Sequence, residues 1–473
     1  MSKTISNISK LTDLKIALKK CGLKNGDTIS FHHQLREGDN VLNLTLEAVK
    51  QLGVKNIRLA QTAIFNVHKP VIDYIKDGIV CRIEGSINGV VGDYVSKHPL
   101  QNPVILRSHG RRWADVKTGN MHIDIAVIGA SSSDEKGNCT GITGKNSFGP
   151  IIYSQIDAMK ADHVIVVTDT VVEYPCMYQE ITEGFVDYVA GVDSIGDPKN
   201  IVSGSTKITD DPVKQQIAHD CISLMGAAGI IKNGMSFQSG AGGISLAATK
   251  YLGEAIEEKN VTASFAIGGI TKYLIDIYEN GRIKKLYYGQ CFDCESVKYI
   301  SEKTGVPILD VGHYADPLSK GKAVDSLDVV VLGATEVDTK FNVNVNTHSD
   351  GKLLHGIGGH QDTAAGAKLT IITAPLYRKK NPIVREKVTT ITTPGSVVDA
   401  IVTNEGIAIN PERKDILEKV KGKINLVSIE ELKDMAYAQT GKPELLNFGD
   451  EIVAEIKWLD GSVLDRVYRV KGS

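Results

Sequence analysis

Short, continuously apolar runs alternate along this chain with segments whose apolar residues recur at helical spacing. Continuous apolar runs are typical of strands buried on both faces of a parallel sheet, and the amphipathic segments between them are typical of covering helices. The alternation therefore predicts an α/β fold with mainly parallel sheets. Strands are expected at residues 28–31, 57–59, 104–106, 123–128 and 164–167, and later at residues 235–237, 283–287 and 327–332.

Helical spacing begins near the N-terminus, where leucines over residues 11–18 predict an opening helix that Thr12 or Asp13 would cap. Residues 452–470 follow a different pattern, typical of a small antiparallel β ribbon that turns near Asp460. The α/β part of the chain is therefore expected to end in a short all-β segment. Further helices are expected at residues 42–49, at residues 244–255 and from Thr363 onward.

Three internal matches, in the same order along the chain, indicate two similar halves. The matching pairs are LKNGDTISF at residues 23–31 with IKNGMSF at 231–237, IDIAVIGA at 123–130 with LDVVVLGA at 327–334, and VDYVAGVDSIGDP at 186–198 with VDAIVTNEGIAINP at 398–411. We therefore expect two α/β domains, residues 1–228 and residues 229–473, and the C-terminal ribbon would belong to the second.

Composition narrows the possible functions. The 473 residues are 42% hydrophobic and 23% charged, with 54 Lys and Arg against 56 Asp and Glu, so the net charge is −2. Nucleic acid is therefore not the expected partner, because phosphate binding needs a basic field. No apolar run approaches the ~20 residues that span a bilayer, and the first residues lack the apolar core of a signal peptide, so a cytoplasmic protein is expected. Seven cysteines, an odd number without framework spacing, fit reduced thiols.

Residues that could take part in catalysis or binding follow the predicted strands. Glu336 comes soon after the strand at residues 327–332, where open α/β sheets place their active sites. An acid at this place could be a covalent nucleophile, a general base or a buried structural carboxylate. The sequence alone leaves these alternatives open.

Two glycine-rich turns each precede a predicted helix: the first glycine turn, residues 238–243, and the second glycine turn, residues 356–359. Backbone amides at such turns suit anions and oxyanions, although a tight turn that needs positive φ would have the same composition. The spacing of the first turn is not the dinucleotide-binding pattern. The residues predicted to bind the oxyanion or thioester are Gly240, Ala241, Gly242, Gly243, Gly356, Gly358 and Gly359.

Two basic clusters, residues 32–36 and residues 107–112, also follow predicted strands. Arginine together with histidine at strand ends is suited to binding a polycarboxylate. For either cluster taken alone, solvated surface charge explains the residues equally well. A zinc site at His32 and His33 is not favoured, because adjacent side chains on extended chain point in opposite directions. Cys291 and Cys294 form a lone C-x-x-C without further ligands, so no metal is expected. The predicted carboxylate-binding residues are His32, His33, Arg36, Arg107 and His109.

Long strings of sequence make these residues resemble a known family. SFHHQLREGD at residue 30, RSHGRR at 107, FQSGAGGISLA at 237, ATEVDTKFNVNVNT at 334 and GIGGHQDTAAGAK at 356 are together similar to the citrate lyase alpha chains, within the coenzyme A transferase-like superfamily. The resemblance covers the chain from about Leu11 onward. It implies two coenzyme A transferase-like (NagB/RpiA-like) α/β domains.

The resemblance also implies a reaction: acetyl-S-carrier and citrate give citryl-S-carrier and acetate. The expected partners are the beta (lyase) and gamma (acyl carrier) subunits of a citrate lyase complex, in an oligomer. No cofactor is expected on this chain. The thioester substrate would be acetyl-CoA or the phosphoribosyl-dephospho-CoA group of the acyl carrier. The alternative is a CoA-transferase or hydrolase that acts on another acid, such as citramalate.

Within this resemblance, Glu336 matches the acid of a strand-end E-V-D, which is the nucleophile in more distant transferases. It would attack the thioester, or it would only position or polarise while citrate is transferred directly. Arg111 stands where the family pattern R-S-H-G-G-R has glycine, which could reshape the pocket and change the preferred acid. Glu279, in an E-N-G that carries the nucleophile in many coenzyme A transferases, ends a helical stripe, so we interpret it as part of a helix C-terminus.

Overall fold

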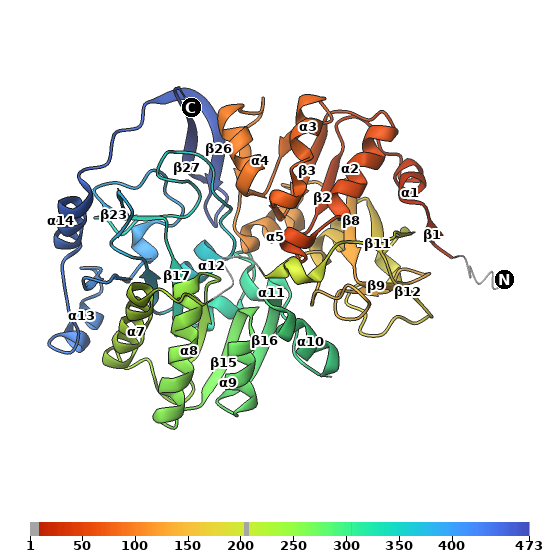
Figure 1. Cartoon of the computed structure of the whole chain (residues 1–473). Helices are drawn as coiled ribbons and strands as arrows, with labels where there is room; N and C mark the ends of the chain where they lie inside the picture. Colours follow the sequence, from red (N-terminus) through yellow and green to blue (C-terminus); the bar gives the residue numbers. More distant parts are fainter. Residues whose placement is uncertain (1–8, 203–207, 304, 473) are drawn as a thin grey trace.

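The computed structural model describes residues 9–202, 208–303 and 305–472, and its chain forms two α/β halves that lie side by side (Figure 1). Each half contains one seven-stranded sheet. In the first half the strand order is β1 (Leu11–Thr12), β13 (Tyr188–Gly191), β11 (His163–Thr168), β8 (Ile125–Ala130), β2 (Thr28–Phe31), β3 (Ile57–Gln61) and β5 (Val80–Ile83). In the second half it is β25 (Ile407–Ile409), β24 (Ala400–Val402), β20 (Thr370–Thr373), β17 (Val329–Gly333), β14 (Ser236–Ser239), β15 (Ala263–Ile270) and β16 (Ile283–Cys291).

The two sheets have equivalent strand orders. All neighbours in the first sheet are parallel. The second sheet is parallel except for its last pair, β24 with β25. Equivalent three-stranded sheets lie beside them: β10 (Cys139–Thr140), β9 (Ser132–Asp134) and β12 (Val171–Val172), matched by β19 (Val343–Asn344), β18 (Glu336–Asp338) and β23 (Val384–Arg385). The predicted α/β class and internal repeat are confirmed.

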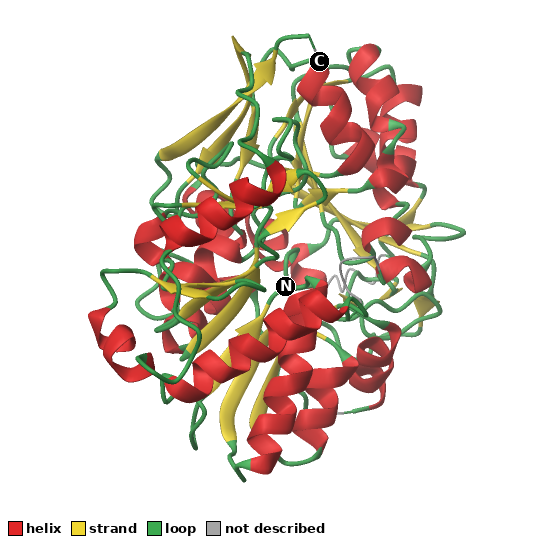
Figure 2. Cartoon of the chain, turned by 60° about the vertical axis from the view of Figure 1, so that its left-hand side comes forward, coloured by secondary structure: helices red, strands yellow, loops and turns green. Residues whose placement is uncertain are grey.

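Helices lie on the outside of the strands, as alternation of apolar runs with amphipathic segments predicts (Figure 2). The first half has α1 (Leu14–Lys20), α2 (Val41–Gln51), α3 (Val71–Lys76), α4 (Gly89–Lys97), α5 (His109–Thr118) and α6 (Gln155–Lys160). Later helices are α7 (Pro212–Ala227), α8 (Gly243–Glu258), α9 (Lys272–Glu279), α10 (Cys294–Glu302), α11 (Val311–Ala315), α12 (His360–Gly366), α13 (Lys414–Val420) and α14 (Ile429–Thr440). One large apolar core runs through both halves.

The opening segment differs from its prediction. Leu11 belongs to β1, which pairs with β13, and the helix α1 begins only at Leu14. Asp13 caps α1 by accepting a hydrogen bond from the N–H of Ile16 at 3.1 Å. Helical spacing of leucines could not show that Leu11 pairs with a strand far away in the sequence.

The C-terminal ribbon consists of β26 (Phe448–Lys457) and β27 (Val463–Val470), which are antiparallel as predicted. It returns to the first half, where β26 pairs in parallel with β7 (Val104–Leu106) and β27 lies against α4 (Figure 1). Conversely, α7 precedes the predicted boundary at residue 228 but packs against α8, β20 and β24. The boundary at residue 228 stays a prediction. The C-terminal ribbon crosses back to the first half, and α7 packs against the second half.

Candidate active site between the two halves

A large cavity of about 900 Å³ lies between the halves, where loops after the strands of both sheets meet. This position follows from the fold, because the carboxyl ends of parallel strands lie at one edge of a sheet and leave a crevice there. In the first half its lining includes residues that follow β2, β3 and β7. In the second half it includes residues that follow β14, β16, β17 and β20, together with Gly268 and Gly269 of β15.

Three of the five predicted carboxylate-binding residues line this cavity: His33, Arg36 and His109. The rings of His33 and His109 are stacked with centroids 5.8 Å apart, and Tyr153 packs against both. The guanidinium of Arg36 lies over the ring of Phe65 at 5.3 Å, a favourable cation–π geometry. The structure thus brings together, on the first-half side, one cation and three rings that carry hydrogen-bonding groups.

His32 and Arg107 are placed elsewhere. The Nε2 atom of His32 lies 3.2 Å from a carboxylate oxygen of Asp157, which also forms an ion pair with Arg112. Arg107 forms ion pairs with Glu84 and with Asp115. Neither His32 nor Arg107 lines the cavity, so a direct grip on a carboxylate there is not supported for these two residues.

Burial determines the charge of the cavity histidines. It lowers the pKa of His33 well below its ordinary value, and neighbouring cationic groups act in the same direction. The pKa of His109 falls to about 4, first because of burial and then because of Arg112. Both rings are therefore neutral hydrogen-bonding groups near pH 7. Arginine keeps its charge in proteins, so Arg36 is the cation of this cluster even though burial lowers its pKa.

The first glycine turn, in the second half, also forms part of the cavity wall and leads directly into α8. Gly242 is the N-cap of this helix and has no side chain to occupy the first backbone amides. Among the described residues, no acceptor is bonded to the N–H groups of residues 241–245. The predicted anion-binding amides at Gly240 to Gly243 thus lie at the cavity wall, and those of residues 241–243 are free to donate.

The second glycine turn also lines the cavity, but it has a further role in joining the two halves. The carbonyl of Gly358 accepts the N–H of His109 at 3.0 Å. Just beyond the turn, Asp362 on α12 accepts bonds from Ser108 Oγ at 2.7 Å and from the N–H of Gly110 at 3.1 Å. Burial raises the pKa of Asp362 to about 7. These contacts connect the second half to the residues on either side of His109.

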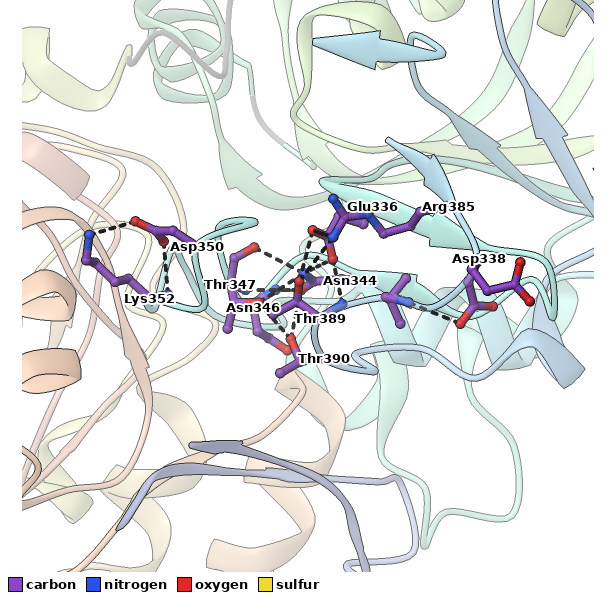
Figure 3. Close-up of polar contacts among 12 residues, drawn as sticks. Glu336, Asp338, Asn344, Asn346, Thr347, Asp350, Lys352, Arg385, Thr389 and Thr390 are labelled. Atoms are coloured by element: carbon purple, nitrogen blue, oxygen red, sulfur yellow. Dashed lines mark hydrogen bonds and ion pairs between the residues drawn. The ribbon is translucent and has the colours of Figure 1, made fainter. Parts of the chain in front are cut away.

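Glu336 is completely buried and does not line the cavity. One carboxylate oxygen accepts from Arg385 Nη1 at 2.6 Å and from Thr389 Oγ1 at 3.0 Å (Figure 3). The other accepts from Asn344 Nδ2 at 3.0 Å and from the N–H of Thr389 at 2.7 Å. All four donors belong to the protein, so a nucleophilic attack would first require the carboxylate to leave them. The geometry favours the structural alternative for Glu336.

The internal repeat explains why an E-V-D motif occurs at this place. Asp338 ends β18 and accepts the N–H groups of Lys340 and Asn342, which makes a tight turn. Asp134 ends the equivalent strand β9 and holds an equivalent turn of the first half. In that half Ser132 opens β9, at the position that Glu336 has in β18. The motif therefore belongs to a repeated turn, and a carboxylate at its first position is a feature of the second half alone.

Two other sequence features have structural roles. The guanidinium of Arg111 donates to the carbonyl of Leu459 at 3.3 Å and forms an ion pair with Asp115, which places it against the turn of the C-terminal ribbon. Arg111 does not line the cavity, so its predicted effect on the acyl or carrier pocket has no direct contact to support it and stays a prediction. The prediction for Glu279 is confirmed, since it ends α9 and Gly281 follows with φ +72°. Cys291 ends β16 and is buried, whereas Cys294 begins α10 and is exposed.

Tyr153, Gln238 and Gln290 are among the polar residues of the cavity that were not predicted to bind a substrate. The hydroxyl of Tyr153 donates to Gln290 Oε1 at 3.3 Å, and Gln238 Nε2 donates to the hydroxyl of Tyr314 at 2.9 Å. Gln238 had a usable signal, because it is the first residue of the first glycine turn. Tyr153 and Gln290 had none, since each is a lone polar residue that only the tertiary fold brings to the cavity.

Comparison with known proteins identifies the family of this chain. Residues 8–470 match the family model described as citrate lyase, alpha subunit. The chain is 42% identical to the citrate lyase alpha chain of Haemophilus influenzae over 473 residues, which is 100% of this chain and 95% of that protein. The chain belongs to the citrate lyase alpha-subunit family.

Solved structures agree with membership of this family. The putative alpha subunit of citrate lyase from Streptococcus mutans, solved in complex with citrate, has a TM-score of 0.96 and 43% identity. The match covers 99% of this chain and 93% of that one. A 4-hydroxybutyrate CoA-transferase from Porphyromonas gingivalis, 16% identical, has a TM-score of 0.58 and covers 91% and 96% of the two chains, which shows a shared fold. In the described residues, no helix is long and apolar enough to cross a membrane.

Proposed function

We propose that this chain is the transferase subunit of a citrate lyase, which moves the acyl-carrier thiol from an acetyl thioester to citrate. The reaction is acetyl-S-carrier plus citrate to citryl-S-carrier plus acetate. The observation that carries the proposal is a single cavity with a cationic, hydrogen-bonding side in one half and amide-rich glycine turns in the other. Family membership and the citrate-bound Streptococcus mutans relative support the choice of citrate as the acid.

The two sides of the cavity suit the two substrates. Citrate carries three carboxylates and a hydroxyl, and Arg36, His33 and His109 offer one charge and several hydrogen bonds on the first-half side. The thioester carbonyl needs donors that stabilise an oxyanion, and the free amides at the start of α8 supply them. A volume of about 900 Å³ leaves room for both molecules at once. The cavity thus supports a complex in which acid and thioester are bound together.

Direct transfer between the substrates is the mechanism that this cavity supports. Among the described lining residues there is no cysteine, and the one carboxylate is that of Glu37, which accepts bonds from Asn66 and from the N–H of Val67. A carboxylate oxygen of citrate would attack the thioester carbon and expel the thiolate, which leaves an anhydride. The thiolate would then attack the citryl carbon of that anhydride and expel acetate. This sequence conserves the activated acyl bond, so no ATP is consumed.

The proposed partners follow from this reaction. The thioester would be presented by the phosphoribosyl-dephospho-CoA group of a gamma (acyl carrier) subunit, or by acetyl-CoA in its place. A beta subunit would cleave the citryl thioester, and the three chains would assemble as an oligomer. Membership of a citrate lyase family supports assembly into such a complex.

The test is acyl exchange by the purified chain, with acetyl-CoA, citrate and mass detection of citryl-CoA. We expect citryl-CoA and acetate to form in equal amounts. An Arg36→Met variant should raise the KM for citrate more than the KM for acetyl-CoA, because it removes the cation of the acid side. Exchange with another acid such as citramalate, in place of citrate, would contradict the assigned acid. Release of free CoA without a new thioester would make the chain a hydrolase.

A further inference from the structure

The wall of the cavity at the start of α8 contains a side chain that no interaction within the protein explains. Ser245 is 1% exposed and lines the cavity, yet its hydroxyl has no hydrogen-bond partner among the described residues. A buried hydroxyl without a partner costs free energy, typically about 1–3 kcal/mol, so such a group in a native fold calls for an explanation. A ligand that bonds to it would provide one.

The position of the hydroxyl shows where this ligand would lie. A methyl group added at Gly240 would be 3.6 Å from Ser245 Oγ, and one added at Gly242 would be 4.0 Å away. The hydroxyl therefore faces the first glycine turn. The carbonyl of Ser245 is already used, because it accepts the hydroxyls of Ser239 and Thr249 at 2.6 and 3.1 Å.

The helix that carries Ser245 adds donors at the same place. With 16 residues, α8 has a substantial dipole, and its positive end lies at the cavity wall. The free N–H groups of residues 241–245 and the hydroxyl of Ser245 thus form one cluster of donors. Among the described lining residues no carboxylate belongs to this wall, so an oxygen that becomes negative is the ligand that fits.

We infer that Ser245 is a catalytic residue, whose hydroxyl donates a hydrogen bond to the carbonyl oxygen of the bound acetyl thioester. This inference rests on the proposed function. When the citrate carboxylate bonds to the thioester carbon, the π pair of the carbonyl moves onto its oxygen, and Ser245 holds that oxyanion together with the amides of α8. When the carbon–sulfur bond breaks, the pair returns to form the carbonyl and the thiolate leaves. The serine keeps its proton throughout.

The experiment compares Ser245→Ala with Thr249→Ala as a matched control. Thr249 is buried on the next turn of α8 and donates to the carbonyl of Ser245, but it does not line the cavity. Removal of one oxyanion donor typically costs about 10²-fold or more in kcat. We therefore expect Ser245→Ala to lower kcat for citryl-CoA formation about 10²-fold with an unchanged dissociation constant for citrate, and Thr249→Ala to keep both values near those of the wild type.

A second measurement does not depend on turnover with citrate. Infrared difference spectra of acetyl-CoA labelled with ¹³C at the carbonyl should show a lowered stretching frequency when it is bound to the wild type and to Thr249→Ala. This shift should be reduced in Ser245→Ala. The same pattern without citrate exchange would keep Ser245 and refute the assigned acid. An absent or unchanged shift, or a loss of citrate binding in Ser245→Ala, would overturn the assignment of Ser245.

Discussion

Replacement of Glu336 by glutamine distinguishes the structural role of this carboxylate from a nucleophilic one. Both oxygens of Glu336 accept two hydrogen bonds, from donors on Arg385, Thr389 and Asn344. Glutamine keeps one acceptor oxygen, and its amide group would face two donors wherever it is placed. It would also leave the charge of Arg385 unpaired at 5% exposure.

The expected cost is therefore that of breaking a buried ion pair from one side, about 3–5 kcal/mol in the free energy of unfolding. Denaturant unfolding followed by fluorescence, with exchange assayed well below the transition, separates stability from activity. We expect Glu336→Gln to unfold at a lower denaturant concentration and to keep substantial exchange per folded molecule. The double variant Glu336→Gln with Arg385→Met should recover part of the stability, because it removes the unpaired charge as well.

The opposite outcome would refute this reasoning. If Glu336→Gln unfolds like the wild type and has no exchange, the carboxylate takes part in the chemistry and must leave its partners during turnover. Detection by mass spectrometry of an acyl or thioester adduct on Glu336 in the wild type would support the same conclusion. In that case the cavity of the resting protein would have to open towards β18.

Three further predictions concern the rest of the cavity. Asp362→Asn should raise the KM for citrate, because it disturbs the backbone next to His109. Asp316→Asn should leave this KM unchanged, because Asp316 forms an ion pair with the far end of the same helix, α5; steady-state kinetics of both variants tests the difference. Citrate binding should take up protons and tighten as the pH falls towards 6, because the pKa of His109 is about 4 and a bound anion raises it. Calorimetry in two buffers of different ionisation enthalpy measures the uptake, and release of protons would contradict it. Gly356→Ala should lower the thermal unfolding temperature, since the added methyl group would lie 1.6 Å from Ser86 Oγ; a wild-type temperature would contradict the packing of this turn.

Local sequence patterns predicted the positions of strands along the chain well, but they did not predict which strands pair with one another. The run at residues 28–31 coincides with β2, and the run at 164–167 lies within β11, and both are buried on two faces. Leu11 and β7 show the limit of such patterns. Leu11 joins a strand through a partner near residue 189, and β7 is correctly placed along the chain but pairs with β26, so its sheet could not be deduced from local sequence.

In the candidate site too, local sequence indicated residues near strand ends but not the contacts that their side chains make in the tertiary fold. His33 and Arg36 follow β2 and line the cavity, because parallel strands bring their carboxyl ends to one edge of a sheet; His109 follows β7 and also lines it, and the predicted carboxylate binding by these three residues stays a prediction. His32 was included for the same reason, although adjacent residues on extended chain face opposite ways, and it lies against Asp157 on the other side. The E-V-D motif drew attention to Glu336, and only its four protein partners show that the carboxylate is already occupied.

The pairing of β26 with β7 has a consequence for how the chain is made. Synthesis delivers β7 early, but its partner strand spans residues 448–457, close to the C-terminus. During synthesis, β7 therefore has no partner along this edge until residues 448–457 have left the ribosome. An isolated fragment of residues 1–228 would keep that edge exposed, and unpaired strand edges promote association between chains. Residues 448–457 thus complete a sheet of the half that is translated first.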